Sequence, residues 1–184
     1  MASKNSAPVT LGATFTFISE ESAFENELTA NGSANPATLK EGATAPITYT
    51  FALAQSGDIY AELTNVSGEL VQYGYDANND NRLTGGEIML QGTPSDITFE
   101  DLLILALTTG KTTFLAQFED SPHDPALVDY NDFVTSIEIG GVSFKKPNSG
   151  RGNGPELAFV NGQIVEVDPG NSGGHNNGGD IFPY

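Results

Sequence analysis

The sequence predicts an all-β protein, an antiparallel β-sandwich or jelly roll with calcium-binding loops and at most one short helix. Glycine is abundant, with 21 among 184 residues, and the composition lacks the Lys, Glu, Ala and Leu richness of helical bundles. Several short segments alternate apolar and polar residues between turn-forming residues, which is the pattern of half-buried strands. The chain is long enough for one domain with a substantial core.

The first predicted strand covers residues 9–18, where Val9, Leu11, Ala13, Phe15 and Phe17 alternate with polar or small residues. Residues 19–36 are acidic and predict turns rather than regular structure. Further strands are predicted over residues 47–53, 58–66, 69–75, 87–92, 111–119 and 132–144. Ser67 and Gly68 predict a hairpin between 58–66 and 69–75.

Residues 93–110 contain the one helix candidate. Thr98 is a suitable N-cap, Asp101 follows three residues later, and Gly110 stands past the end. The apolar run between them also fits a buried strand, so both interpretations stay open. Near the end of the chain, Asn-Gly at 161–162 predicts a hairpin over residues 156–168.

We therefore expect three parts: a flexible leader at 1–8, a single β-sandwich domain at 9–168 and a Gly/Asn-rich tail at 169–184. No run approaches the ~18 apolar residues of a membrane-spanning helix, so membrane insertion is not expected.

The charge of the chain is strongly asymmetric. Seven basic residues face 24 acidic ones, a formal net charge of −17. Nucleic acids and anionic membranes both require a cationic face, so they are not expected partners. Divalent cations would relieve the self-repulsion. The chain contains no cysteine, so thiol catalysis and disulfides are excluded. We expect bound calcium to stabilise the fold in place of disulfides.

Residues 75–87 (YDANNDNRLTGGE) have the spacing of a calcium loop, in which positions 1, 3, 5, 7, 9 and 12 supply oxygen ligands. The corresponding ligands are Asp76, Asn78, Asp80, the backbone carbonyl of Arg82, Thr84 and Glu87. Leu83 is an apolar anchor at position 8. Asn81 replaces the usual glycine at position 6, and asparagine tolerates a left-handed backbone better than other side chains. The alternative is a solvated turn between two strands.

A second group of oxygen donors lies in residues 118–133 (FEDSPHDPALVDYNDF). A strand end and a returning loop can bring such carboxylates to one ion. The candidate ligands are Glu119, Asp120, Asp129, Asn131 and Asp132, with Asp124 also in the segment. The alternative here is a polar turn in which Asp120 or Asp132 accepts hydrogen bonds from backbone amides.

This second segment, extended to residue 139, resembles the FED…DYND signature of a family of domains of unknown function in bacterial extracellular proteins, which often carry calcium-binding repeats or surface anchors. TFTFISEESAFENEL (14–28) resembles the opening segment of that family, and the resemblance covers roughly residues 13–140. It implies an extracellular β-sandwich with calcium held by Glu119, Asp120, Asp129, Asn131 and Asp132. Residues 122–125 (Pro-His-Asp-Pro) replace a glycine-rich turn of the family.

No catalytic set stands out, and we expect a protein that is not an enzyme. The two histidines, His123 and His175, lie in loop-like segments, and a glycosidase based on Glu62 and Glu69 would lack tryptophan platforms for sugar. The favoured function is a calcium-binding structural subunit of an extracellular fibre, layer or biofilm matrix. It would self-associate into a homopolymer by strand addition, with residues 9–18 as the favoured donor and the apolar end of the tail (GDIFPY, 179–184) as a second candidate. The alternative is that residues 9–18 pair within their own domain. The alternative is a calcium-dependent lectin that binds carbohydrate.

Overall fold

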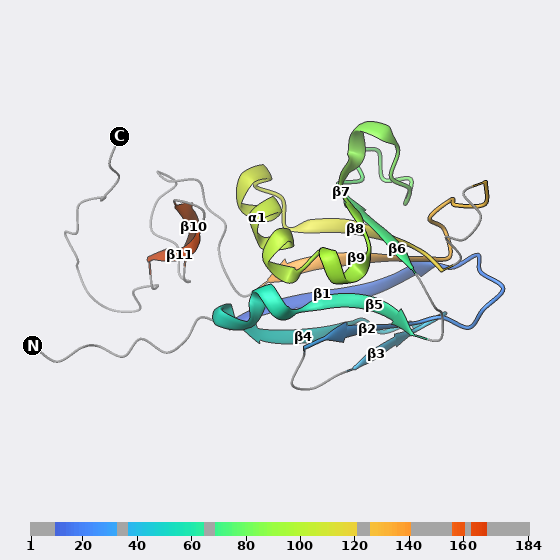
Figure 1. The fold of residues 1–184 in the computed structure, drawn as a ribbon, viewed down its shortest axis with the longest axis horizontal. Helices are drawn as coiled ribbons and strands as arrows, with labels where there is room; N and C mark the ends of the chain where they lie inside the picture. The colour runs from blue at the N-terminus through green and yellow to red at the C-terminus, as the bar shows by residue number, and fades with distance from the viewer. Residues whose placement is uncertain are drawn as a thin grey trace, which may run out of the picture.

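The structure is a computed structural model that describes residues 10–32, 37–64, 69–120, 126–140, 156–160 and 163–168. The predicted leader and tail lie outside the described residues. The described part is an antiparallel β-sandwich with one α-helix, which confirms the predicted fold class (Figure 1).

One sheet has six strands in the order β4-β1-β9-β8-β6-β7, and the other has three in the order β3-β2-β5. The elements of the six-stranded sheet are β1 Thr10–Ser19, β4 Ile47–Ala52, β6 Leu70–Gly74, β7 Ile88–Gly92, β8 Thr113–Glu119 and β9 Phe133–Gly140. The three-stranded sheet contains β2 Glu27–Asn31, β3 Thr38–Lys40 and β5 Tyr60–Thr64. The remaining elements are α1 Phe99–Thr109, the short 3-10 turns η1 Leu53–Asp58, η2 Gly85–Glu87 and η3 Pro94–Asp96, and the pair β10 Glu156–Val160 and β11 Gln163–Asp168.

Strand β1 confirms the predicted alternation. Leu11, Ala13 and Phe15 are buried, whereas Thr16 between the apolar positions is exposed. The strand lies inside the six-stranded sheet, where it pairs antiparallel with β4 on one edge and β9 on the other. Residues 10–19 therefore belong to the sheet of their own chain.

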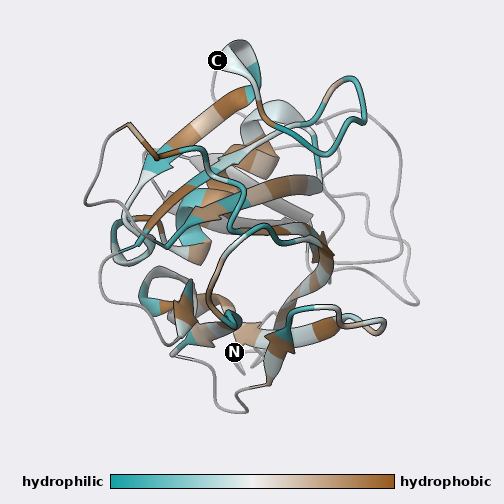
Figure 2. Ribbon diagram, turned by 90° about the vertical axis from the view of Figure 1, so that its right-hand side faces the viewer, coloured by the Kyte–Doolittle hydropathy of each residue, from teal (hydrophilic) through white to brown (hydrophobic). Residues whose placement is uncertain are grey.

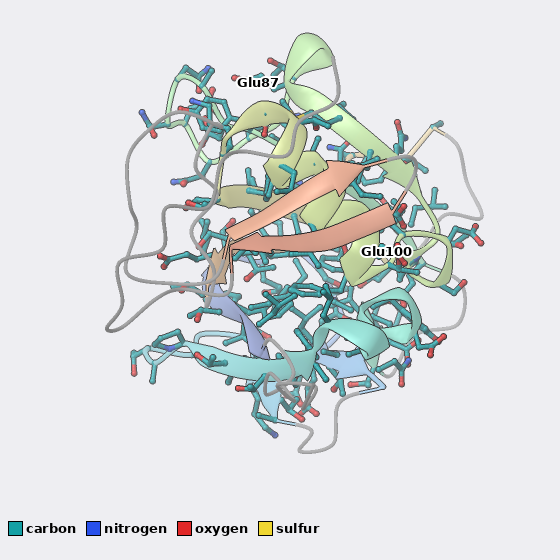
Figure 3. The ribbon with its side chains drawn as sticks, turned by 90° about the vertical axis from the view of Figure 1, so that its left-hand side faces the viewer. Glu87 and Glu100 are labelled. Atoms are coloured by element: carbon teal, nitrogen blue, oxygen red, sulfur yellow. The ribbon has the colours of Figure 1, made fainter. Side chains whose placement is uncertain are left out.

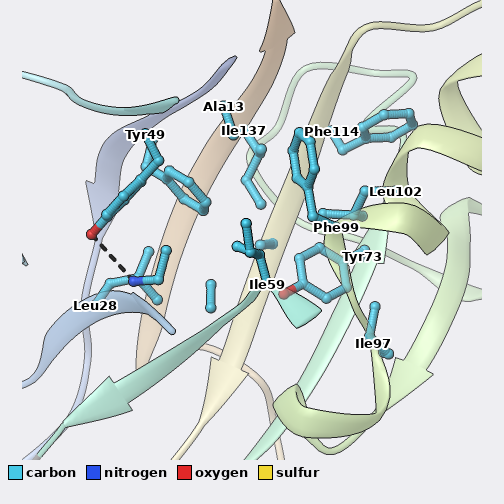
Figure 4. Close-up of a cluster of buried hydrophobic side chains, with 14 of the residues drawn as sticks. Ala13, Leu28, Tyr49, Ile59, Tyr73, Ile97, Phe99, Leu102, Phe114 and Ile137 are labelled. Atoms are coloured by element: carbon cyan, nitrogen blue, oxygen red, sulfur yellow. Dashed lines mark hydrogen bonds between the residues drawn. The ribbon is translucent and has the colours of Figure 1, made fainter. Parts of the chain in front are cut away.

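The core lies between the inner faces of the two sheets, and Figure 4 shows part of it. Tyr49 of β4 is fully buried, and its hydroxyl accepts a hydrogen bond from the Ala30 amide of β2 at 3.2 Å and donates one to the Ala37 carbonyl. A buried tyrosine needs a partner for its hydroxyl. Here that partner is the opposite sheet, so Tyr49 joins the two layers. Figure 2 shows the hydrophobic residues concentrated on the strands and hydrophilic ones in the connecting loops.

The helix prediction is confirmed and the buried-strand interpretation is wrong. Thr98 is the N-cap of α1, and its side chain and that of Asp101 satisfy each other's backbone amides in a capping box. Gly110 ends the helix in the left-handed conformation at φ 68°, which glycine adopts without steric cost. The buried face of α1 includes Leu103 and Ala106. Within the described residues, no helix is long and apolar enough to cross a membrane.

Two predictions about the sheets are wrong. The acidic segment 19–36 contains β2, because Leu28 and Ala30 alternate with polar residues and pack into the core. Strands β5 and β6 do not form a hairpin: β5 pairs with β2, and β6 pairs with β7 and β8. Both edges of β6 are thus occupied, and β5 and β6 belong to different sheets. Residues 65–68, with the predicted turn, lie outside the described residues.

The predicted hairpin at 156–168 is confirmed as the antiparallel pair β10 and β11. Ile164 of β11 packs against the main core. The prediction that the 75–87 loop joins two strands is also confirmed, because the loop connects β6 to its antiparallel neighbour β7.

Candidate metal centre

The end of β8 and the start of β9 form the base of the candidate site. These strands pair antiparallel with Phe118 opposite Phe133, so the residues just beyond each partner lie at the same end of the sheet. Strand β8 is buried on both faces from residue 114 onward. Its last residue, Glu119, and the following Asp120 therefore lie in the protein interior. Their exposed fractions are only 2% and 5%. Carboxylates are rarely so buried unless something pairs with them.

Three carboxylates meet at this place. Glu119, Asp120 and Asp132 each place one oxygen within 4.8 Å of the others. Two oxygens bound to the same calcium ion at 2.3–2.6 Å can be at most about 5 Å apart, so the spacing fits a shared ion. The Asp120 amide donates to Asp132 Oδ2 at 2.8 Å, which fixes Asp132 against the end of β8.

The backbone of the returning loop supports Glu119. Its Oε2 accepts hydrogen bonds from the Asp129 amide at 3.0 Å and from the Tyr130 amide at 3.4 Å. Tyr130 adopts a left-handed backbone at φ 57°, a conformation that is uncommon for a residue with a large side chain. The loop therefore turns sharply beside the buried carboxylate.

The electrostatics of the cluster are those of acids forced together. The pKa of Asp132 is raised to about 7, chiefly by burial; the hydrogen bond from the Asp120 amide opposes the rise, and the nearby charges of Asp120 and Glu119 add to it. Burial and like charge both disfavour a carboxylate anion. The cluster thus favours a bound proton when no cation is near, and a divalent cation would compete with that proton.

The connection between β1 and β2 closes over the cluster. Asp120 Oδ2 accepts hydrogen bonds from Ser22 Oγ at 2.5 Å and from Asn26 Nδ2 at 2.8 Å. The same connection is tied to the 126–132 loop, because the Glu21 amide donates to the Asn131 carbonyl at 3.2 Å and Asn131 Nδ2 donates to Glu21 Oε2 at 3.0 Å.

Asn26 has an unusual place in this connection. It is 1% exposed, and its Oδ1 has no hydrogen-bond partner among the described residues. Sequence reasoning did not single out Asn26 or Ser22. The available signal was that both residues lie in the 14–28 segment, which resembles the opening of the FED…DYND family.

The structure brings together three of the five candidates in this segment. Glu119, Asp120 and Asp132 converge, whereas the Asp129 carboxylate accepts from the Asn131 amide and the Asn131 side chain contacts Glu21. Asp124 and His123 lie outside the described residues. The polar-turn alternative is confirmed in one respect, because Asp132 accepts a hydrogen bond from the Asp120 backbone amide. That hydrogen bond joins two members of the carboxylate cluster.

The 75–87 loop organises its acids differently. The carboxylate of Asp76 accepts hydrogen bonds from the amides of Asn79, Asp80 and Asn81 at 2.7–3.3 Å. Asp80 Oδ1 accepts from the Arg82 amide at 3.0 Å. Asn81 is left-handed at φ 64°, as its place at the sharp turn requires.

Glu87 closes the base of this loop. Its Oε1 accepts from the Ala77 amide, and its Oε2 accepts from the Thr84 amide and hydroxyl, all at 3.0 Å. The Thr84 amide contributes most to lowering the pKa of Glu87, followed by the Ala77 amide. Glu87 lies on the outside of the molecule (Figure 3). Leu83 is buried against Leu115 and Val134, as the predicted anchor.

Among the described residues, Asp76, Asp80 and Glu87 do not form a second group of converging carboxylates like the one at Asp132. Calcium binding by this loop stays a prediction.

Comparison with protein families, with curated proteins and with solved structures gives no match for this chain. The resemblance to the FED…DYND family therefore also stays a prediction.

Proposed function

We propose that this protein is a non-enzymatic, calcium-stabilised β-sandwich that serves as a structural subunit of an extracellular assembly. The observation that supports it best is the buried convergence of Glu119, Asp120 and Asp132. Three carboxylates in a low-dielectric place repel one another. A divalent cation would replace that repulsion with attraction and would tie the end of β8 to the start of β9.

Calcium fits this cluster better than other common ions. The donors are all oxygens, which hard cations prefer, and cysteine is absent from the chain. Magnesium usually keeps several waters and binds through one or two carboxylates. A cluster with three carboxylates, two of them almost fully buried, instead favours an ion that accepts many protein oxygens in irregular geometry.

Burial also favours a structural role over a catalytic or sugar-binding one. An ion that activates water or chelates sugar hydroxyls must keep an open coordination position. Glu119 and Asp120 are nearly inaccessible. Of Glu62 and Glu69, the acid pair weighed against a glycosidase role, Glu69 is engaged in the fold, since its Oε2 accepts a hydrogen bond from the Leu63 amide at 2.7 Å.

The first experiment is thermal unfolding with calcium and with a chelator. A ligand that binds only the folded state stabilises it by about 2.7 kcal/mol at a hundredfold excess over Kd. For a domain of this size we therefore expect the midpoint to rise by about 5–10 °C. Magnesium at the same concentration is the control and should raise it less. An equal midpoint with calcium and chelator contradicts the proposal.

Self-association is the second part of the proposal. The net charge of −17 repels identical chains, and bound calcium reduces it. Because β1 pairs on both edges within its own chain, the predicted donation of this strand to a neighbour is not part of the proposal. Among the described residues, the edge strands of the six-stranded sheet are β4 and β7, and they are the better candidates for contacts between copies. Sedimentation velocity should show larger species in calcium than in chelator, and a monomer in both would contradict this part.

A further inference from the structure

We infer that Asn26 supplies a neutral oxygen ligand to the ion in this cluster, so that one ion fastens the two sheets of the sandwich together. The inference rests on the proposed function, because it adds a ligand to the same site. It assigns a role to a residue that lies 93 positions before Glu119 in the sequence.

The unpartnered oxygen of Asn26 is the observation that leads to this role. Asn26 is 1% exposed, and its Oδ1 has no hydrogen-bond partner among the described residues. A buried polar atom left without a partner destabilises the fold, because it has lost its hydrogen bonds to water without replacement. Such an atom is therefore expected to meet a water, an ion or a ligand. The same amide group donates from Nδ2 to Asp120 Oδ2 at 2.8 Å, so Oδ1 lies beside the carboxylate cluster.

The chemistry of the amide suits this position. Calcium accepts the carbonyl oxygen of asparagine together with carboxylates. When no ion is bound, a fourth carboxylate would add repulsion to three acids that already repel one another, whereas an amide oxygen adds a ligand without adding charge. Asn26 thus offers what a crowded acidic site still needs.

Asn26 and the three acids lie at strand ends of different sheets, so an ion bound by all four would link the two sheets. Asn26 immediately precedes β2, which belongs to the three-stranded sheet. Glu119, Asp120 and Asp132 lie at strand ends of the six-stranded sheet. An ion held by both sets would join the two layers at this end of the sandwich, near where the β1–β2 connection crosses between them. The chain has no cysteine, so no disulfide can link the two sheets. The ion would supply such a link.

A purely positioning role for Asn26 makes different predictions. In that role Asn26 matters only because Nδ2 donates to Asp120 Oδ2, and Ser22 Oγ donates to the same oxygen. Asn26→Ala removes both the donor and the oxygen. Asn26→Asp removes the donor and keeps an oxygen, and Ser22→Ala removes only a donor to Asp120.

The test is calcium affinity measured by titration calorimetry on the full chain. All variants are made in an Asp80→Asn background, which removes a predicted ligand of the other loop and simplifies the titration. We expect Asn26→Ala to weaken calcium binding by about tenfold or more, which corresponds to about 1.4 kcal/mol. Asn26→Asp should bind at least as tightly as the parent, and Ser22→Ala should lose less than Asn26→Ala.

Each outcome separates the inference from the proposal beneath it. Equal affinity of Asn26→Ala and the parent overturns the inference and leaves calcium binding intact, and so does equal weakening of Asn26→Ala and Asn26→Asp. A parent that binds no calcium overturns the proposed site itself. If Asn26→Ala does not fold, Asn26→Asp decides alone: weaker binding than the parent overturns the inference, and retained binding with a midpoint that depends more strongly on calcium supports it.

Discussion

The loop from Asp76 to Glu87 and the cluster of Glu119, Asp120 and Asp132 each contain three carboxylates, but only those of the cluster converge, and two of those three are buried. In the loop, every carboxylate accepts hydrogen bonds from backbone amides less than twelve residues away. In the cluster, the acids come from two strand ends and face one another. The loop is exposed, whereas Glu119 and Asp120 are buried.

The pKa shifts follow this difference. Backbone amides lower the pKa of Glu87, while burial and neighbouring charge raise the pKa of Asp132 to about 7. The spacing of acids along a chain therefore does not determine whether they converge. Convergence depends on which strand ends the sheet brings together, and the demand for a cation depends on burial.

Exchanging one carboxylate for an amide in each region gives the sharpest contrast. We expect Asp132→Asn to abolish most of the calcium-dependent rise in melting temperature, because it removes a charged ligand from the buried cluster. Asp80→Asn in the exposed loop should leave most of that rise, about 5–10 °C at a hundredfold excess of calcium over Kd. Differential scanning calorimetry with calcium and with chelator measures both.

The reverse result would transfer the stabilising site to the loop. If Asp80→Asn removes the rise and Asp132→Asn keeps it, the buried cluster is an acid group that holds a proton rather than an ion. Loss of the entire rise in both single variants would mean that the two regions do not bind independently.

Local patterns in the sequence predicted a large share of this structure. Alternation placed β1, and the capping residues Thr98 and Gly110 placed α1, because both signals depend only on near neighbours. The register of the 75–87 loop correctly predicted a left-handed Asn81 and a buried Leu83.

What the sequence did not predict depends on contacts between distant segments. Asn26 and Asp120 are 94 residues apart in the sequence. They meet only because the β1–β2 connection crosses between the two sheets. The hairpin expected between β5 and β6 failed for a similar reason. Strand β6 had two better partners, β7 and β8, and neither is visible from the turn residues beside it.

Glu69, a half-buried acid outside both regions, tests whether burial alone explains the pKa shift at the cluster. Burial raises the pKa of Glu69 to about 7, the Leu63 amide opposes the rise, and the charge of Glu62 adds to it. The folded state then holds this proton more tightly than the unfolded state, so stability falls as pH rises from about 4.5 to 7. Above pH 7 the loss is complete.

Replacing Glu69 with glutamine removes this pH-dependent loss. We expect Glu69→Gln to be more stable than the parent at pH 8 by about 1 kcal/mol, a value reduced for partial exposure, and to match it at pH 4. Urea unfolding in chelator at both values measures the difference. Glu138→Gln, an exposed exchange on β9, is the control and should change little. A Glu69→Gln advantage that is the same at both pH values would show that packing, and not charge, is responsible.

The smallest effect on melting temperature is expected for a substitution at Glu87, which should alter only the hydrogen bonds of its own loop. Its two oxygens accept from the Ala77 amide and from the amide and hydroxyl of Thr84. Charged acceptors make stronger hydrogen bonds than neutral ones, and glutamine has only one accepting oxygen. In chelator, Glu87→Gln should therefore speed hydrogen exchange at the amides of Ala77 and Thr84 while leaving the melting temperature nearly unchanged.

The same two amides should respond to pH. Because the pKa of Glu87 is lowered in the folded state, the stabilisation that its carboxylate gives is present above its unfolded-state pKa and is lost as the pH falls through its folded-state pKa. The parent should lose protection at these two amides on acidification, and the variant should not. A large fall in melting temperature would instead place the loop in the cooperative core, and the contrast with the buried cluster would then no longer hold.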